Sequence, residues 1–385
     1  MNRFRFGEIR VIYFDNNATT PLSPSVREAM LPFLGEAFGN PNSVHEAGTR
    51  TRAAIERART KVANGLGVTA SEITFTGSGS EANNHAVIGA LLAQEASGKN
   101  LVVSSIEHPS VGVTAAWAAK RFGFELRVAP FRVESDRVDP SPFLERIDTD
   151  TVLVSVMAAN NETGVLMPLE PIFQAAKKVG ALCHTDAVQG FGKIDLRPVE
   201  WGVDLLGISG HKFHGPKGAG ALFIRRGVKI EPLIHGGPQE SARRAGTENV
   251  ANIVGLGVAA EEAAVADKTT IRALRDYFES RLADGWAGSA SVNFQKLLRT
   301  PNASSVLFAG QDANLLMIKL DRKGVCISTG AACSSGSLTA SKTLLAMGLK
   351  ETQATATLRF SFSKYNTKSE VDEALDRLAQ ILPPN

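Results

Sequence analysis

Short apolar runs rich in β-branched residues alternate along the chain with longer stretches in which apolar residues recur at helical spacing. The runs that we predict to be strands are 72–76, 101–105, 151–157, 181–186, 203–209 and 220–224. Stretches of helical length, such as 110–122 and 169–179, lie between most of them. This alternation predicts an α/β fold with a mostly parallel sheet covered by helices on both faces. Because such sheets bind ligands at the carboxyl ends of their strands, the residues that follow strands are the first functional candidates.

The hydrophobic pattern changes near residue 250. An alanine-rich stretch of helical pattern extends from there to about residue 283, and alternating strand and helix patterns follow it. At roughly 150 residues per domain, a chain of 385 residues has room for two or three domains. We therefore predict a large domain over residues 15–258 and a smaller α+β domain that combines residues 1–14 with residues 259–385.

The composition argues against several classes of protein. Hydrophobic residues make up 43% and charged residues 21% of the chain, and 42 basic against 39 acidic residues leave a net charge of +3. This balance favours neither nucleic acid nor an anionic membrane as a partner. No apolar run approaches the roughly 20 residues of a membrane-spanning helix, and residues 1–10 lack the apolar segment of a secretory signal. We therefore expect a cytoplasmic protein that binds neither nucleic acid nor membrane.

The three cysteines are an odd number without a C-x-x-C pair, which fits neither a disulfide framework nor a zinc knuckle. Cys183 and Cys326 lie in apolar strand patterns, and we predict both to be core residues. Cys333 lies instead in residues 327–337 (ISTGAACSSGS), where a run of small residues predicts a mobile loop. An exposed thiol that can become a thiolate is suited to nucleophilic chemistry. The spacing of the histidines and cysteines favours no metal site.

A turn rich in glycine and serine, residues 76–81 (TGSGSE), follows the predicted strand 72–76 and precedes a helical pattern. Glycines allow a ligand to approach the backbone, and the unpaired N–H groups at a helix start attract a phosphate. The alternative is a capping box from Ser78 to Glu81 that only starts the helix. The turn alone is consistent with both interpretations. It is not a Walker A loop, because the Gly-Lys-Ser/Thr ending is missing.

Two charged residues follow other predicted strands. Asp186 ends the strand 181–186, where a buried carboxylate needs a cationic partner such as a protonated pyridine nitrogen. The alternative, which is the commoner role of a single aspartate, is a helix cap or a surface ion pair. Lys212 follows the strand 203–209 more closely than Lys217 does, and partial desolvation there would give the lowered pKa that imine formation requires. Most single lysines are solvated instead. Taken together, however, the amine, the pyridinium partner and the glycine-rich turn meet the requirements of pyridoxal 5'-phosphate.

A series of motifs along the chain resembles the pyridoxal-phosphate-dependent cysteine desulfurases of the nitrogen-fixation and iron–sulfur-cluster (NifS/IscS) type, within the class V aminotransferase superfamily. The motifs are YFDNNATTP (13–21), GNPNSVH (39–45), GSGSEAN (77–83), EHP (107–109), NNETG (160–164), HTDAVQ (184–189), SGHK (209–212), RRAGTEN (243–249), GAACSSG (330–336) and RFS (359–361). They occur in order and span nearly the whole chain. The resemblance implies the fold of the fold-type-I pyridoxal-phosphate transferases, with a large cofactor-binding domain and a smaller α+β domain.

The resemblance also implies roles for individual residues toward the cofactor. Lys212 corresponds to the imine-forming lysine, Asp186 to the partner of the pyridine nitrogen, and Gln189 to the hydrogen-bond partner of the ring hydroxyl. His108 corresponds to a residue that stacks on the ring and carries protons. The positions that match phosphate ligands are Gly79, Ser80, Ser209, His211 and Thr247. Of these, Thr247 matches the residue that reaches into the active site of a neighbouring subunit, which implies a homodimer.

The substrate implied by the resemblance is L-cysteine. Asn161 and Arg359 match positions that hold the substrate carboxylate, a role suited to a planar guanidinium. Cys333 matches the sulfur acceptor, which takes the sulfur as a persulfide while the rest of the substrate becomes L-alanine. The persulfide then passes to a sulfur-accepting protein, for iron–sulfur clusters or other thiolated products.

Two other interpretations of the function leave some of these residues without a role. A selenocysteine lyase or aminotransferase of the same superfamily would leave Cys333 without a role. A catalytically silent sulfur-transfer platform would have no use for Lys212 or Asp186, and the presence of both residues together with Cys333 disfavours it.

Overall fold

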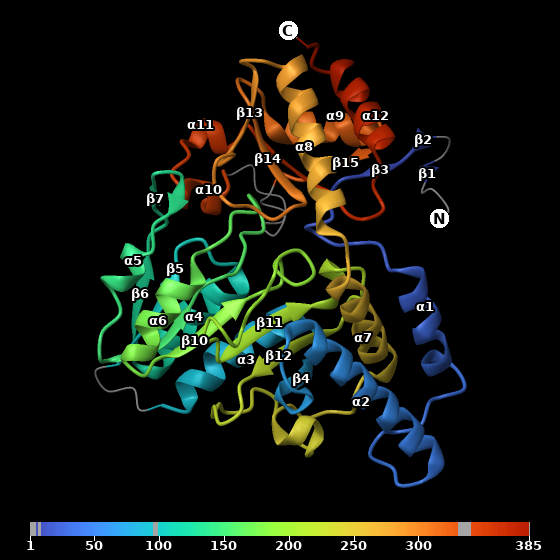
Figure 1. Cartoon of the computed structure of the whole chain (residues 1–385), viewed down its shortest axis with the longest axis vertical. Helices are drawn as coiled ribbons and strands as arrows, with labels where there is room; N and C mark the ends of the chain where they lie inside the picture. Colours follow the sequence, from blue (N-terminus) through green and yellow to red (C-terminus); the bar gives the residue numbers. More distant parts are fainter. Residues whose placement is uncertain (1–4, 7–8, 95–98, 330–339, 385) are drawn as a thin grey trace.

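The larger, lower part of the molecule is built on a seven-stranded sheet with the order β4-β12-β11-β10-β9-β5-β6 (Figure 1). This computed structural model describes residues 5–6, 9–94, 99–329 and 340–384. The strands are β4 (Ile73–Thr76), β5 (Asn100–Ser104), β6 (Glu125–Ala129), β9 (Thr151–Ser155), β10 (Leu182–Asp186), β11 (Leu205–Ser209) and β12 (Gly220–Ile224). Every strand predicted in this region is present. The edge strand β6 was not predicted, because most of its residues are partly or fully exposed and form no apolar run.

The neighbouring strands from β11 to β6 are parallel, and only β12 runs antiparallel to both of its neighbours. The prediction of a mostly parallel sheet is therefore confirmed. Since two antiparallel pairings separate β4 from β11, these strands point the same way. The carboxyl ends of six strands thus lie along one edge of the sheet, where ligands bind in folds of this kind.

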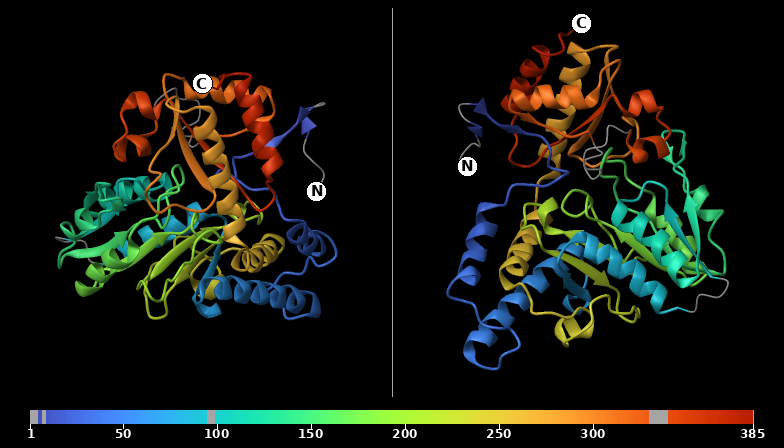
Figure 2. Two further views of the ribbon diagram at one scale, coloured as in Figure 1. Left: turned by 45° about the horizontal axis from the view of Figure 1, so that its top comes forward. Right: turned by 180° about the vertical axis from the view of Figure 1, so that it is seen from behind.

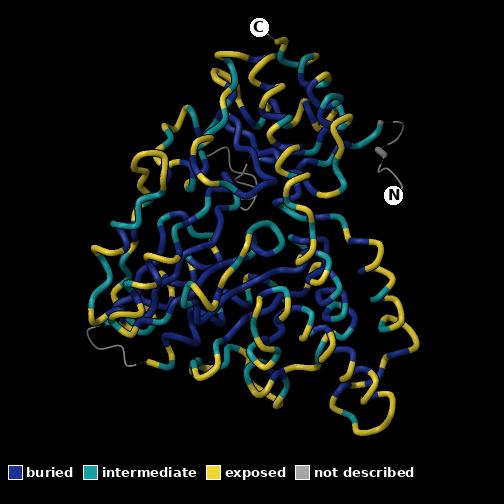
Figure 3. Tube along the Cα trace, in the orientation of Figure 1, coloured by how far each residue is buried: buried dark blue, intermediate teal, exposed yellow. Residues whose placement is uncertain are grey.

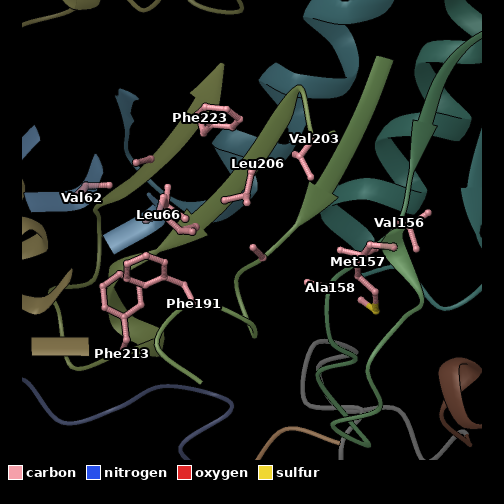
Figure 4. Close-up of a cluster of buried hydrophobic side chains, with 14 of the residues drawn as sticks. Val62, Leu66, Val156, Met157, Ala158, Phe191, Val203, Leu206, Phe213 and Phe223 are labelled. Carbon is pink, nitrogen blue, oxygen red and sulfur yellow. The ribbon is translucent and has the colours of Figure 1, made fainter. Parts of the chain in front are cut away.

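Helices cover both faces of this sheet, and buried residues follow its strands (Figure 3). One face packs on α3 (Gly79–Leu92) and α4 (Pro109–Phe122), and the other on α2 (Glu46–Leu66), α6 (Leu169–Lys178) and α7 (Val250–Ala264). Successive strand residues alternate between the faces: Leu101 and Val103 pack on the first side and Val102 on the second. Figure 4 shows part of the second cluster, around Leu206 and Phe223. Burial on both faces explains the nearly continuous apolar runs of the sequence.

A second core lies in the upper part of the molecule, coloured orange and red in Figure 1. Its antiparallel sheet contains β13 (Ala290–Val292), β14 (Ala303–Phe308) and β16 (Thr357–Ser361), packed with α8 (Lys268–Gly285), α9 (Ala313–Arg322) and α12 (Lys368–Ala379). The N-terminal strand β3 (Ile12–Tyr13) pairs with β15 (Val325–Cys326), and the N-terminal segment, coloured blue, reaches the upper part in both views of Figure 2. Ile12 and Phe14 are fully buried in the same core. These contacts support our proposal that the N-terminal segment belongs to the small domain.

The alanine-rich stretch 250–283 is not one continuous helix. It forms α7 and α8, separated at residues 265–267, because Asp267 caps the second helix and accepts a hydrogen bond from the Thr269 backbone N–H at 2.8 Å. The boundary predicted after residue 258 falls inside α7, which packs along α2 in the core of the large sheet. We therefore propose that the domain boundary lies in the connection between the two helices.

The remaining elements are short. They are β1 (Arg5–Phe6), β2 (Ile9–Arg10), β7 (Val133–Glu134), β8 (Arg137–Val138), α1 (Pro24–Met30), α5 (Ser141–Leu144), α10 (Lys342–Ala346), α11 (Glu351–Ala354) and four 3-10 turns, η1 (Leu31–Leu34), η2 (Ala70–Glu72), η3 (Gly210–Lys212) and η4 (Gln239–Ala242). None of the described helices is both long and apolar enough to cross a membrane.

The core prediction holds for one of the two strand cysteines. Cys183 is fully buried in the large core, as predicted. Cys326 is only partly buried, because β15 is a two-residue strand beside the exposed Asp321, whose Oδ1 lies 3.8 Å from the Cys326 Sγ. The apolar sequence pattern was therefore misleading for Cys326. Cys333 lies outside the described residues.

Candidate active site

A cavity of about 440 Å³ lies at the carboxyl ends of the strands. Most of the residues predicted for the active site line it, namely Gly79, Ser80, His108, Asn161, Asp186, Gln189, Ser209, His211, Lys212 and Arg359. They follow β4, β5, β9, β10 and β11 of the large sheet, and Arg359 comes from β16 of the small sheet. Residues that are far apart in the sequence are therefore brought together at the edge where parallel sheets bind ligands.

Asp186 is held by neutral hydrogen-bond donors inside this cavity. Its Oδ2 accepts from Asn83 Nδ2 at 2.7 Å, and its Oδ1 accepts from the backbone N–H of Val188 at 2.9 Å. Burial raises the pKa of Asp186, whereas the field of His108 and these two hydrogen bonds lower it. A desolvated carboxylate of this kind is stabilised by a cation that enters the cavity.

The glycine-rich turn caps a helix and also borders the cavity. Ser78 caps α3 by accepting from the Glu81 backbone N–H at 3.0 Å, and the Glu81 Oε2 accepts from the Gly77 backbone N–H at 2.8 Å. The same turn places the start of this 14-residue helix at the cavity. A Cβ on Gly79 would lie 2.7 Å from Val188 Cγ2 and 3.0 Å from Ser209 Cβ, so this close approach requires glycine. Unpaired N–H groups at such a helix start are suited to a phosphate.

Lys212 ends the 3-10 turn η3, directly after β11. Its Nζ donates to the backbone carbonyls of Asn17 and Ala18, both at 2.8 Å. The preceding His211 contacts Thr19 from the same N-terminal segment, with 3.1 Å between Nδ1 and Oγ1. Burial lowers the pKa of His211 to about 4, with the neighbouring lysines acting in the same direction, so this imidazole is neutral at pH 7. The YFDNNATTP motif thus forms one wall around the lysine.

His108 caps the N-terminus of α4. Its Nδ1 accepts from the Ser110 backbone N–H at 3.1 Å and lies 2.8 Å from the Ser110 Oγ. Burial lowers the pKa of His108, with Lys212 acting in the same direction and Asp186 against it, so we take the ring as neutral. Because Nδ1 accepts a backbone hydrogen bond, the proton of the neutral ring is on Nε2. Nε2 is therefore the nitrogen with a proton to transfer.

Arg359 is fixed by two oxygen acceptors. Its Nη2 forms an ion pair with Asp15 Oδ1 at 2.7 Å, and its Nη1 donates to the backbone carbonyl of Asn161 at 2.9 Å. The Asn161 carbonyl also accepts from Asn17 Nδ2 at 3.2 Å. These contacts hold a planar guanidinium at the edge of the cavity, an arrangement suited to binding a carboxylate.

The sequence analysis missed Lys193, a second lysine beside the cavity. Its Nζ lies 2.5 Å from Gln189 Oε1 and 3.2 Å from Asn17 Oδ1. Lys217, the lysine that we compared with Lys212, is exposed. The analysis also missed Asn83, although its spacing of four residues from Gly79 places the two on one helix face. No local pattern pointed to Lys193, because its partner Asn17 is 176 residues away in the sequence.

Of the predicted site residues that the structure describes, Thr247 does not line this cavity. Thr247 lines a different cavity of about 190 Å³, together with Gly77, Arg244 and Glu248. The role assigned to Thr247 concerns a neighbouring subunit and stays a prediction. Cys333 is in the part of the chain that the structure does not describe.

Comparison with known proteins gives consistent matches over nearly the whole chain. The model of the family described as aminotransferase class-V matches residues 12–374. The cysteine desulfurase IscS of Dictyoglomus turgidum is 44% identical over 97% of this chain and 95% of that protein. A solved NifS-like protein is 37% identical with a TM-score of 0.88, covering 97% of this chain and 99% of its own. A structure described as SspA in complex with cysteine is 34% identical with a TM-score of 0.81, covering 92% and 99% of the two chains.

Proposed function

Since the chain belongs to the class-V aminotransferase family, we propose that it is a pyridoxal-phosphate-dependent cysteine desulfurase that converts L-cysteine to L-alanine. The observation that carries this proposal is the meeting of Lys212, Asp186 and the start of α3 in one cavity. A volume of about 440 Å³ is within the range of small-molecule sites. The likeness to desulfurases extends over 97% of the chain, so it covers the whole of this site.

The residues present fit pyridoxal phosphate. Asp186 is a buried carboxylate with only neutral hydrogen-bond donors within bonding distance, and a protonated pyridine nitrogen supplies the missing positive charge. Gly79 allows the start of α3 to approach Val188 and Ser209 closely, and Ser80, Ser209 and His211 line the same cavity and would hold the phosphate. When bound, the cofactor withdraws electrons from the substrate's α-carbon and so makes its proton and the β-sulfur removable.

The protein's own groups then bind the substrate and move its protons. Arg359 and Asn161 would hold the carboxylate, and the Lys212 amine would act as the base that removes the α-proton. His108 holds the proton on Nε2 for transfer near the substrate sulfur. The Cys333 thiolate forms a bond to that sulfur as the sulfur–carbon bond breaks. The electron pair of the broken bond stays with carbon, which takes up a proton to become alanine, and Cys333 keeps a persulfide.

Three further features are proposed on the resemblance. The protein is a homodimer in which Thr247 contributes to the neighbouring subunit's site, which agrees with its absence from the residues that line the cavity of its own chain. A sulfur-accepting protein takes the persulfide for iron–sulfur clusters or other thiolated products. The location of the enzyme is the cytoplasm, as the composition led us to expect.

Incubation of the purified holoenzyme with L-cysteine and a reductant tests the function. A desulfurase releases alanine and sulfide in equal amounts, because each turnover splits one sulfur–carbon bond. An aminotransferase instead consumes an amino acceptor and produces no sulfide, and a silent platform produces neither product. Absence of alanine from L-cysteine, in protein that carries the cofactor, contradicts the proposal.

A mixed dimer tests whether the sites are shared. With Thr247→Ala in one subunit and Lys212→Ala in the other, shared sites place both lesions in one site and leave the second intact. We expect this mixed dimer to be more active than either homodimeric variant. An active fraction no larger than that of the homodimers contradicts sharing.

A further inference from the structure

We propose that Lys193 is a positioning residue that fixes the orientation of the Gln189 carboxamide, so that its Nε2 and not its Oε1 faces the ring oxygen of the cofactor. This inference rests on the proposed function, because it assigns Lys193 a role toward bound pyridoxal phosphate. Lys193 performs no catalytic step of its own, because it acts through Gln189.

The hydrogen bonds at the two ends of the carboxamide agree on its orientation. The Lys193 Nζ lies 2.5 Å from one terminal atom of Gln189, and an ammonium group has only hydrogens to donate, so that atom is the oxygen Oε1. The other terminal atom lies 2.9 Å from the Asn17 backbone carbonyl, which can only accept, so that atom is Nε2. Nε2 carries a second hydrogen, and Gln189 lines the cavity. The cavity therefore meets a donor at this position.

Aromatic packing holds the turn that carries Lys193 against the turn that carries Lys212. The rings of Phe191 and Phe213 are both buried, with centroids 4.7 Å apart (Figure 4). Between Phe191 and Lys193, Gly192 adopts φ +74°, and a Cβ there would lie 2.8 Å from the Cβ of Ala263. The backbone before Lys193 therefore has little freedom to move its amine away from Gln189.

The surroundings of Lys193 are unusual for a lysine. Its Nζ donates to two side-chain amide oxygens, Gln189 Oε1 and Asn17 Oδ1. The charged groups that act on it are Lys212 and Arg359, and both are cations. Burial lowers the pKa of Lys193 well below its usual value, and these two cations lower it further. A neutral amine still has N–H groups for Gln189, and the Asn17 carbonyl fixes Nε2 at the other end of the carboxamide in either protonation state of Lys193.

Asn17 connects the two lysines. Its backbone carbonyl accepts from both Gln189 Nε2 and Lys212 Nζ, at 2.9 and 2.8 Å. Its side-chain Oδ1 accepts from Lys193 and from Asn302 Nδ2, at 3.2 and 2.9 Å. A change at Lys193 therefore reaches the ring contact of Gln189 through one defined network of amides.

This geometry predicts a spectroscopic effect. A hydrogen bond from Gln189 Nε2 stabilises the anionic form of the cofactor's ring oxygen, so the bound chromophore loses its proton at a lower pH. Without Lys193, Oε1 loses its donor, and the carboxamide is no longer held with Nε2 toward the ring oxygen. The ring oxygen then loses its partner, and the visible absorbance band titrates at a higher pH.

The test compares the holoenzyme with its Lys193→Met and Gln189→Leu variants and with the double variant. We expect each single substitution to raise the midpoint pH of the visible band by about one unit, the size of one lost hydrogen bond to a charged oxygen. The double variant should show no further shift beyond Gln189→Leu. If the shifts add, Lys193 acts as a separate charge and the proposal fails. An unchanged midpoint in Lys193→Met also overturns it.

Lys217→Met is the matched control, because it removes a nearby positive charge of the same type without contacting Gln189. Its midpoint should stay at the wild-type value, and the thermal midpoint of each variant shows whether the protein is folded. If Lys193→Met does not fold, Gln189→Glu gives a second test. A carboxylate still accepts from Lys193 but has no hydrogen for the cavity, so the band should titrate at a higher pH; an unchanged midpoint overturns the proposal.

The wild-type spectrum separates this inference from the proposed function. A wild-type protein that forms no imine reducible by borohydride contradicts both. A wild-type protein with a titrating band whose midpoint is insensitive to Lys193→Met contradicts only the role of Lys193.

Discussion

Buried charged groups behave differently in two regions of the large domain. Near β4, Arg59 and Glu240 form a two-point ion pair, with Nη1–Oε2 and Nη2–Oε1 distances of 2.6 and 2.9 Å. Glu240 Oε2 also accepts from the Phe75 backbone N–H at 2.8 Å. In the cavity, by contrast, the Asp186 carboxylate accepts from a side-chain amide and a backbone N–H, and the Lys193 amine donates to two side-chain amides. In the first region two opposite charges pair directly, whereas the side chain of Asp186 has no direct ion pair among the described residues.

This difference separates buried charges that stabilise the fold from buried charges that bind a ligand, and it does so without reference to any related protein. Burial of a charge is costly in both regions, but a matched ion pair offsets that cost within the protein. A buried charge with only neutral partners is a candidate site for a ligand of opposite charge. The two regions therefore predict opposite outcomes when a charge is removed.

Lys212→Ala should have the largest effect on activity. Removal of the amine takes away both the imine-forming group and the base for the α-proton, so alanine formation should fall at least about 10⁴-fold. The variant should fold normally, because the hydrogen bonds from Lys212 to the Asn17 and Ala18 carbonyls lie at the wall of the cavity, where water can replace the amine. Borohydride reduction followed by peptide mapping checks the attachment site. A reducible imine in the variant assigns the chemistry to another lysine, and Lys193 is the first to examine.

Cys333→Ser separates cofactor chemistry from sulfur transfer. The variant should bind pyridoxal phosphate and show the spectral change on adding L-cysteine, because neither step uses the thiol. Alanine formation should fall about 10³-fold, since a hydroxyl is a far weaker nucleophile than a thiolate and cannot carry a persulfide. Residual activity on selenocysteine is compatible with the mechanism, because selenide is a better leaving group. Alanine formation from L-cysteine at the parental rate leaves Cys333 without a role.

Much of this site was predictable from the sequence, for a physical reason. Asp186 and Lys212 end or follow strands of a buried parallel sheet, and the pattern that reveals such strands also reveals where they end. Ser209, which ends β11, was implied by the resemblance alone. The glycine-rich turn was found for the same reason, as it follows β4. Residues defined by their place at a strand end are therefore accessible to sequence reasoning.

The residues that the sequence analysis missed depend on tertiary contacts. Lys193 gains its position from Asn17, which is distant in the chain, and from the packing of Phe191 on Phe213. Cys326 looked like a core residue because its strand is apolar, but the strand has only two residues and one partner. The break between α7 and α8 carried a local signal that we overlooked, since Asp267 before Lys-Thr-Thr is a typical N-cap.

A matched pair of amide substitutions tests the comparison itself. Glu240→Gln removes the buried counter-ion of Arg59 and leaves the guanidinium paired with the exposed Glu56 at 3.2 Å, so it should destabilise the protein by about 3 kcal/mol. Asp186→Asn removes a buried carboxylate that has neutral partners, so the apoprotein should keep its stability within about 1 kcal/mol. Its activity should nevertheless fall at least about 100-fold, because the pyridine nitrogen loses its partner. Urea unfolding of both apoproteins, combined with alanine assays, measures the two effects.

The comparison fails if the two variants behave alike. Equal destabilisation by both substitutions shows that the protein compensates the charge of Asp186 as fully as that of Glu240. Full activity in Asp186→Asn removes the carboxylate from the mechanism.

The smallest expected effect concerns His214, a buried ionisable group behind Lys212 that stays neutral. Its Nδ1 donates to the Pro21 carbonyl at 2.9 Å, and burial lowers its pKa to about 4. A histidine with a lowered folded-state pKa stabilises the fold fully above about pH 6.5, and this contribution is lost as the pH falls toward 4. The shift corresponds to roughly 3 kcal/mol over that interval.

His214→Asn should flatten this pH dependence. Asparagine tolerates the left-handed backbone of this position, φ 69°, and its amide replaces the Nδ1–H donor without titrating. At pH 7 the variant should be about 1 kcal/mol less stable, because the ring also packs edge-on against Tyr365 with centroids 4.8 Å apart. Between pH 6.5 and 4 it should lose less stability than the wild type in urea unfolding. His235→Asn, at an exposed position, is the control and should keep the wild-type slope, whereas a wild-type slope in His214→Asn shows that the acid sensitivity comes from other groups.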